Sequence, residues 1–148
     1  METTIENTKK ASVLLQEFLT SIGAGNPKVT ASFFTEDGCI DAPYVESLGM
    51  PTKIIGRAAI EATMSNIKSI APNFHFTSVK MILESPTEVV AEYESEALMA
   101  NGRTYKQLYM GHLIAKDGKI VSHREFLNTI PFVKAFFPNG LNDLITAK

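Results

Sequence analysis

The chain has 148 residues, of which 45% are hydrophobic and 20% are charged. This length and composition are typical of one soluble globular domain. The net charge of −2 gives no electrostatic basis for binding nucleic acid or an anionic membrane, so neither partner is expected. The single cysteine, Cys39, excludes an intramolecular disulfide and any multi-cysteine metal site. The sequence shows no signal peptide and no apolar run near the roughly 20 residues of a membrane span, so we expect a cytoplasmic protein.

The first half of the chain has the periodicity of amphipathic helices. Thr3 and Glu6 stand three residues apart, as in a capping box ahead of the first helix. Asn26-Pro27 is a typical cap and first-turn pair for a short second helix, and Gly56 precedes the third. The spacing therefore predicts three helices, over residues 11–22, 27–34 and 57–71.

The second half of the chain predicts a β-sheet. A turn is expected at Glu36-Asp37-Gly38, followed by a short strand over residues 39–43 and a loop or irregular strand to residue 55. Four longer strands are predicted over residues 74–84, 88–100, 103–115 and 119–128. The Asn-Gly and Asp-Gly dipeptides between the last three strands are hairpin signals, so these strands should form an antiparallel meander. The order of helices first and strands afterwards predicts an α+β fold with helices on one face of a curved sheet. Residues 131–137 are expected to form a C-terminal helical turn or lid.

The hairpin turns set which side chains share a face of this sheet. If both turns have two residues, Lys116 pairs with Lys119 and Ala100 pairs with Arg103. One face then carries Ala91, Tyr93, Ser95, Met110, His112, His123, Glu125 and Leu127. This set is mostly small and apolar with a few polar groups, as in a ligand pocket, and the other face should meet solvent or a second subunit. A one-residue bulge at either turn would reverse the assignment.

Several segments resemble one superfamily, the nuclear-transport-factor-2-like (NTF2-like) proteins. FFTEDGCIDAP, residues 33–43, resembles the segment after the second helix of SnoaL-like proteins, and IGRAAIEA, residues 55–62, resembles the start of their third helix. The run REFLN, residues 124–128, is similar to one in the phenazine-biosynthesis A/B condensation proteins. The resemblance implies that residues 1–148 form a single SnoaL-like domain: an NTF2-like cone, in which a curved antiparallel sheet wraps around three helices.

The same resemblance implies roles for particular residues. In the condensation proteins the glutamate of the REFLN-like run is the acid/base residue, which implies that role for Glu125. A histidine after the glycine that opens their third helix corresponds here to Arg57. Arginine does not exchange a proton near neutral pH, but it can clamp a carboxylate, so the departure weakens the case for the same reaction.

Ketosteroid isomerases share this fold and need three groups that this chain lacks. Their oxyanion tyrosine falls at Phe18, which has no hydroxyl group, and their protonated aspartate falls near Met110. Their base aspartate directly precedes a proline, whereas Ala42 separates Asp41 from Pro43. Steroid isomerisation is therefore not expected.

The candidate site combines the predicted face with the resemblance. Glu125 is expected to act as a general acid/base whose pKa an apolar cavity raises, with His123 tuning or assisting it. Both residues also have a purely structural interpretation: Glu125 as a solvated carboxylate and His123 as a packed histidine. Tyr93 and His112 are expected to orient a substrate oxygen. Substrate-binding roles are assigned to Tyr93, His112, Met110, Asp41, Arg57 and Leu127.

A metal site built from the two histidines and Glu125 is conceivable, but nothing completes it, so no metal is expected. The chain has no Gly-rich phosphate loop and no nucleophile elbow, so no cofactor is expected either. We therefore expect a cofactor-independent enzyme, of isomerase, cyclase, dehydratase or condensation type, that acts next to a carbonyl or imine in a small apolar or aromatic metabolite. We expect it to be a homodimer through the outer face of the sheet. The alternatives are a non-catalytic binding or scaffold module and a protein-interaction domain.

Overall fold

A computed structural model describes residues 8–145, and its central element is one six-stranded sheet with the order β2-β1-β6-β5-β4-β3. All neighbouring strands are antiparallel except β1 and β6, which are parallel. The strands are β1 (Phe34–Asp41), β2 (Lys53–Ile55), β3 (His75–Glu84), β4 (Glu88–Leu98), β5 (Thr104–Lys116) and β6 (Lys119–Leu127). The helices are α1 (Ala11–Ala24), α2 (Pro27–Ser32), the 3-10 helix η1 (Pro43–Leu48), α3 (Arg57–Ile70), α4 (Thr129–Phe136) and α5 (Asn142–Ile145).

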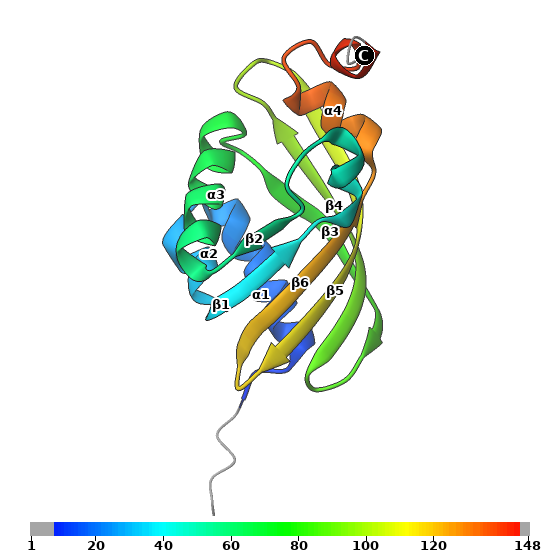
Figure 1. The fold of residues 1–148 in the computed structure, drawn as a ribbon. Helices are drawn as coiled ribbons and strands as arrows, with labels where there is room; N and C mark the ends of the chain where they lie inside the picture. The colour runs from blue at the N-terminus through cyan, green and yellow to red at the C-terminus, as the bar shows by residue number, and fades with distance from the viewer. Residues whose placement is uncertain (1–7, 146–148) are drawn as a thin grey trace, which may run out of the picture.

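The sheet is curved, and α1, α2 and α3 lie on one side of it (Figure 1). The side chains of α1 that face the sheet are fully buried, among them Leu14, Leu15 and Phe18. Helix α4 lies at the end of the sheet opposite the start of α1 (Figure 1). This arrangement is the α+β, NTF2-like fold expected from the sequence. Within residues 8–145 no helix is long and apolar enough to cross a bilayer.

The helix predictions are confirmed, with small differences at the ends. Helix α1 ends at Gly25, whose backbone is left-handed with φ of 72°, a conformation that glycine adopts without strain. The side chain of Asn26 accepts a hydrogen bond from the Val29 amide at the start of α2. The proposed capping box of Thr3 and Glu6 lies outside the described residues. The predicted lid is a two-turn helix, α4, whose first turn is capped by Asn128.

The prediction of a turn at Glu36-Asp37-Gly38 is wrong, because these residues belong to strand β1. Their register is irregular: the six residues of β1 from Phe34 to Cys39 run beside the three residues of β6 from Ile120 to Ser122. The turn-forming residues thus produce a bulge within a strand rather than a break between two elements.

The predicted pairing of β4 with β5 is wrong by one residue. Tyr93 pairs with Tyr109 rather than with Met110. The link between the strands is a three-residue loop, because the Met99 amide bonds the Arg103 carbonyl and only Gly102, not its neighbour Asn101, has a positive φ. A two-residue type I′ turn would need a positive φ at both Asn101 and Gly102.

The pairing of β5 with β6 begins as predicted and then shifts. Asp117 and Gly118 both have positive φ, as a type I′ turn requires, and Lys116 pairs with Lys119. Beyond the turn, one extra residue of β6 lies between the pairs Ala115–Ile120 and Ile114–Ser122. This bulge places Leu113 opposite His123 and Gly111 opposite Glu125. The inner face of β5 is therefore formed by Tyr105, Gln107, Tyr109, Gly111, Leu113 and Ala115.

Candidate functional site

Three polar side chains meet on the inner face of the sheet. The Tyr93 hydroxyl oxygen lies 2.8 Å from His123 Nε2 and 2.5 Å from Glu125 Oε2. The direct distance from His123 Nε2 to Glu125 Oε2 is 3.7 Å, so the tyrosine bridges the other two groups. Alternation along β6 puts His123 and Glu125 on one face, and Tyr93 reaches them from β4, two strands away.

Gly111 makes this bridge possible. It pairs with Ala91 of β4 and with Glu125 of β6, so it lies on β5 between the two strands that the bridge joins. A Cβ atom at Gly111 would lie 2.4 Å from the hydroxyl oxygen of Tyr93 and 2.7 Å from its Cε1 atom. The missing side chain therefore lets the tyrosine ring lie across β5. Gly111 is not among the candidates named from the sequence, although a glycine inside a strand often marks such a close approach.

Aromatic rings pack against the Tyr93 and His123 side chains of the bridge. Tyr109 stacks on Tyr93 with ring centroids 5.1 Å apart, and Phe18 packs edge-on against His123 at 5.3 Å. Tyr93 and His123 are almost completely buried, whereas 18% of the Glu125 side chain is exposed. Glu125 is thus the member of the group that a small molecule can reach.

Burial changes the protonation of all three groups. It raises the pKa of Glu125 to about 7, although the hydrogen bond from Tyr93 acts in the opposite direction. Burial, with a smaller effect of His112, lowers the pKa of His123 to about 4, and burial next to Glu125 raises the pKa of Tyr93 well above its ordinary value. At neutral pH His123 and Tyr93 are therefore uncharged, and Glu125 is the group that gains and loses a proton.

The proton positions follow from the same geometry. A phenol has one hydrogen to donate. When Glu125 is ionised it can only accept, so the Tyr93 hydroxyl donates to the carboxylate and His123 Nε2–H donates to the Tyr93 oxygen. Both donors then stabilise the ionised form of the carboxyl group.

Glu125 lies in the wall of a cavity of about 310 Å³. Strands β1, β2, β5 and β6, with η1, α3 and α4, contribute to its lining. The apolar wall includes Val45, Met50, Ile67, Leu127, Phe132 and Phe136. Apart from two tyrosines, Glu125 is the only acidic or basic residue among the described residues that line it. An apolar cavity with few polar groups is the usual form of a small-molecule site.

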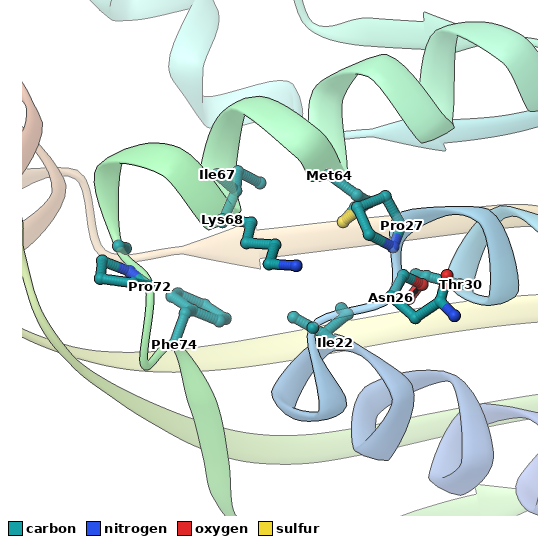
Figure 2. Close-up of a pocket in the computed structure, with 11 residues that line it drawn as sticks. Ile22, Asn26, Pro27, Thr30, Met64, Ile67, Lys68, Pro72 and Phe74 are labelled. Carbon is teal, nitrogen blue, oxygen red and sulfur yellow. Dashed lines mark hydrogen bonds between the residues drawn. The ribbon is translucent and has the colours of Figure 1, made fainter.

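A second hollow lies between α3 and the place where α1 and α2 meet (Figure 2). Its volume is about 20 Å³, enough for about one water molecule. Met64, Ile67 and Phe74 line both hollows, but none of the site residues named above lines the smaller one. The cavity that Glu125 lines is therefore the candidate site.

The structure brings some predicted residues together and separates others. Tyr93, His123, Glu125 and Leu127 face the inside. The prediction that Met110 and His112 line the pocket is wrong, because the three-residue loop between β4 and β5 and the bulge in β6 turn both side chains to the outer face.

On the outer face His112 Nε2 bonds Glu88 Oε1 at 2.5 Å, and Met110 is 39% exposed. Because His112 and His123 lie on opposite faces of the sheet, the metal site considered from the sequence is not assembled. Met110, the position matched to the ketosteroid isomerase aspartate, also points away from the cavity.

Asp41 and Arg57 do not line the cavity. Arg57 donates two hydrogen bonds to the carbonyl oxygen of Phe34, at 3.2 and 2.8 Å, which joins the start of α3 to β1. The Asp41 carboxylate lies 3.4 Å from Nε of Arg124. Its chain neighbours Ile40 and Ala42 line the cavity, so Asp41 lies beside the cavity wall.

Replacing Gly111 by alanine is expected to break the bridge. The new methyl group would overlap the Tyr93 ring, so we expect the free energy of unfolding to fall by about 1–3 kcal/mol. We also expect the pKa of Glu125 to rise, because it loses the hydrogen bond from Tyr93. Urea denaturation and a carbon-13 NMR titration of the carboxyl group would measure the two effects.

A second variant separates this effect from general damage to the strand. In a Tyr93→Leu background the ring is absent, so Gly111→Ala should cost little further stability. Wild-type stability together with an unchanged Glu125 pKa in Gly111→Ala would show that the tyrosine does not depend on the glycine.

Comparisons with known proteins agree with this fold. Residues 15–123 match the model of the SnoaL-like domain, a range that ends two residues before Glu125. The curated protein YesE of Bacillus subtilis (strain 168), named as uncharacterized, is 28% identical over 134 residues, which cover 86% of this chain and 88% of YesE.

Several solved structures have a similar fold. A protein from Bacillus subtilis provisionally named an isomerase has a TM-score of 0.76 at 24% identity, covering 85% of this chain and 91% of that protein. The phenazine biosynthesis-related protein PhzB2 of Pseudomonas aeruginosa has a TM-score of 0.73 at 19% identity, covering 84% and 83%. An NTF2-like protein from Anabaena variabilis has a TM-score of 0.67 at 22% identity, covering 86% and 94%. At these identities the likeness establishes a shared fold.

Proposed function

Because the chain belongs to the SnoaL-like family, we propose that it is a cofactor-independent enzyme that moves a proton next to a carbonyl or imine of a small apolar molecule. The reaction would be an isomerisation, cyclisation, dehydration or condensation. The observation that supports this proposal is a single carboxyl group, Glu125, in the wall of an apolar cavity. A pKa of about 7 leaves it partly ionised at neutral pH, which suits a group that both takes and returns a proton.

In the proposed mechanism Glu125 is the catalytic residue. Its carboxylate removes a proton from the carbon next to the carbonyl, the electron pair of that C–H bond moves to form an enolate, and the resulting carboxylic acid returns the proton at the same or another atom. Tyr93 and His123 are positioning residues, since the Tyr93 hydroxyl is already engaged by His123 and Glu125.

A donor for the enolate oxygen is needed elsewhere, and Tyr109 is the best placed. It lines the cavity together with Glu125. Its hydroxyl lies 2.8 Å from Ser95 Oγ. When Ser95 donates that bond, the Tyr109 hydroxyl in turn donates to the Tyr105 hydroxyl, so a substrate oxygen would receive the Tyr109 hydrogen by replacing Tyr105 as its acceptor. This replaces His112 in the role expected from the sequence.

Isotope exchange tests the proposal without knowledge of the natural substrate. The protein is incubated in D₂O with uncharged ketones such as 4-phenylbutan-2-one, and loss of the protons next to the carbonyl is followed by NMR. We expect exchange faster than in buffer, with a rate that rises with pH around a midpoint near 7, because the ionised carboxylate is the base. Binding of these ketones without any exchange would instead favour the non-catalytic binding module.

We also propose that the protein forms a homodimer through the outer face of the sheet. The support is an exposed apolar row on β5, in which Leu108, Met110 and Ile114 are 49%, 39% and 40% exposed. Glutamates of β4 flank this row, since Glu94 pairs with Leu108 and Glu92 with Met110. Burying such a row against a second copy removes apolar surface from water.

The dimer is tested by light scattering. The wild type should have twice the chain mass of 16.2 kDa, and Leu108→Glu with Met110→Glu should give a monomer, because four like charges would face one another. Ile130→Glu on α4, a site that is 47% exposed, serves as a matched control and should remain a dimer. A monomeric wild type would contradict the proposal.

A further inference from the structure

The cavity extends along strand β5. Glu125 pairs with Gly111, whereas Tyr105, six residues away on the same strand, also lines the cavity. Tyr109 lies between them and lines the cavity as well. The lining therefore runs along β5 from the Glu125 side past Tyr109 to Tyr105, where the Glu125 charge adds to burial in raising the pKa of the Tyr105 hydroxyl.

The end that contains Tyr105 is formed by aromatic rings. Phe132 and Phe136 of α4 stack with centroids 4.7 Å apart, and Phe136 packs edge-on against Tyr105 at 5.0 Å. Phe74 also packs near Tyr105, with ring centroids 6.1 Å apart. All four rings line the cavity, so a ligand that reaches this end meets aromatic carbon.

Hydrogen bonds to the backbone hold α4, and with it this aromatic end, in place. The guanidinium group of Arg103 donates to the carbonyl oxygens of Lys134, Phe137 and Pro138 around the end of the helix. At its start, the Gln107 side chain bonds both the amide and the carbonyl of Asn128. A ligand is thus not needed to order the helix.

The carboxyl end has no partner for an anionic ligand. The other polar side chains along the described lining are neutral: Thr52, Thr63, Asn66 and the two tyrosines. Arg57, the residue that the sequence offered as a carboxylate clamp, is used by the backbone of β1. A carboxylate placed at this end would meet Glu125 with no compensating positive charge, and like charges in a poorly solvated site repel strongly.

We propose that the cavity accepts an uncharged, elongated carbonyl compound, with the carbonyl at Glu125 and an aryl or long alkyl tail among Phe132, Phe136 and Tyr105, and that it rejects the corresponding acids. This inference rests on the proposed function for the placement of the carbonyl. The cavity would select ligands by the charge of the head group and by the length of the tail. A cationic head is disfavoured as the intended ligand because it would lose its hydration in this apolar cavity, and pairing with one buried carboxylate seldom offsets that cost.

Three ligands on one skeleton test the charge selection. They are 4-phenylbutan-2-one, 4-phenylbutan-2-amine and 3-phenylpropanoic acid, whose dissociation constants are measured by calorimetry at pH 8. We expect the ketone to bind at least tenfold more tightly than the acid and more tightly than the amine. In Glu125→Gln the acid should gain affinity relative to the ketone, because the repelling charge is gone. Equal binding of acid and ketone by the wild type, or tightest binding of the amine, would overturn the inference.

A tail series tests the position of the apolar end. From butan-2-one to octan-2-one the affinity should increase about fourfold per methylene group, as expected for burial of a CH₂ group. Phe132→Ala should weaken 4-phenylbutan-2-one more than butan-2-one, whereas Ile130→Ala, which changes an exposed residue of the same helix, should affect neither. An affinity independent of tail length would overturn the inference.

The two proposals fail in different ways. Charge and tail selection without isotope exchange would remove the catalytic proposal and leave the ligand class standing. A second comparison uses 6-phenyl-4-oxohexanoic acid, which carries the same ketone and an added carboxylate. If its exchange is as fast as that of 4-phenylbutan-2-one, the proposed ligand class is removed and the catalytic proposal stands.

Discussion

Replacing Glu125 by glutamine should slow isotope exchange of a bound ketone by a factor of 10² to 10⁴, the usual contribution of a positioned general base. The amide has nearly the same volume, and its oxygen can still accept the hydrogen bond from Tyr93. We therefore expect the fold and the binding of uncharged ligands to persist while proton transfer is lost. Exchange is followed by NMR, and circular dichroism confirms that the variant is folded.

Two further variants sharpen this result. Glu125→Asp keeps a carboxylate but withdraws it by one methylene group, so exchange should be intermediate between those of the wild type and the glutamine variant. Glu88→Gln removes an exposed carboxylate from the outer face of the same sheet and should leave exchange unchanged. Wild-type exchange rates in Glu125→Gln would show that another group is the base.

The pH dependence of stability should report on Glu125 and His123 in opposite directions. Burial raises the pKa of Glu125 from an ordinary 4.5 to about 7. Between these values the folded state holds a proton that the unfolded state has lost, so stability falls as pH rises. Burial lowers the pKa of His123 from 6.5 to about 4. Between these values the unfolded state holds the extra proton, so stability rises with pH.

These two effects overlap between about pH 4.5 and 6.5 and should nearly cancel in the wild type. Glu125→Gln removes the falling contribution, so its free energy of unfolding should rise by roughly 3 kcal/mol from pH 4 to pH 6.5 relative to a variant that lacks both groups. His123→Gln removes the rising contribution, so its stability should fall by a similar amount from pH 4.5 to pH 7.

Urea denaturation at half-unit pH intervals measures these slopes. All the variants share the remaining carboxylates, so the differences between their curves isolate Glu125 and His123. Parallel curves for the wild type and Glu125→Gln would mean that the Glu125 carboxyl has the same affinity for protons in the folded and unfolded states.

The proposed chemistry depends on a buried base that costs stability at neutral pH. A carboxyl group held near pH 7 destabilises the folded state when it ionises, because its charge has little water around it. The hydrogen bonds from Tyr93, and through Tyr93 from His123, offset part of this cost. The site therefore combines an uncommonly basic carboxylate with a rigid donor chain that holds its orientation.

Local sequence patterns determined much of this fold. Apolar periodicity is enough to locate α1 and α3, because a helix buries one face of a 3.6-residue repeat. Alternation locates β4, β5 and β6, and it places His123, Glu125 and Leu127 together because residues i, i+2 and i+4 of a strand share a face. The Asp117-Gly118 turn follows from its two residues, which both tolerate positive φ.

Only the tertiary structure decided what faces Glu125. A three-residue loop with Gly102 in the left-handed region and a one-residue bulge in β6 turned Met110 and His112 outward, and brought Gly111 and Tyr109 inward. Such shifts depend on how whole strands pack, so a dipeptide cannot determine them. The raised pKa of Glu125 is likewise a property of the assembled cavity, because the desolvation comes from η1, α3 and α4, which are distant in sequence. The sequence was thus enough to identify Glu125 as the candidate carboxyl group, whereas its hydrogen-bond partners and its raised pKa depend on long-range packing.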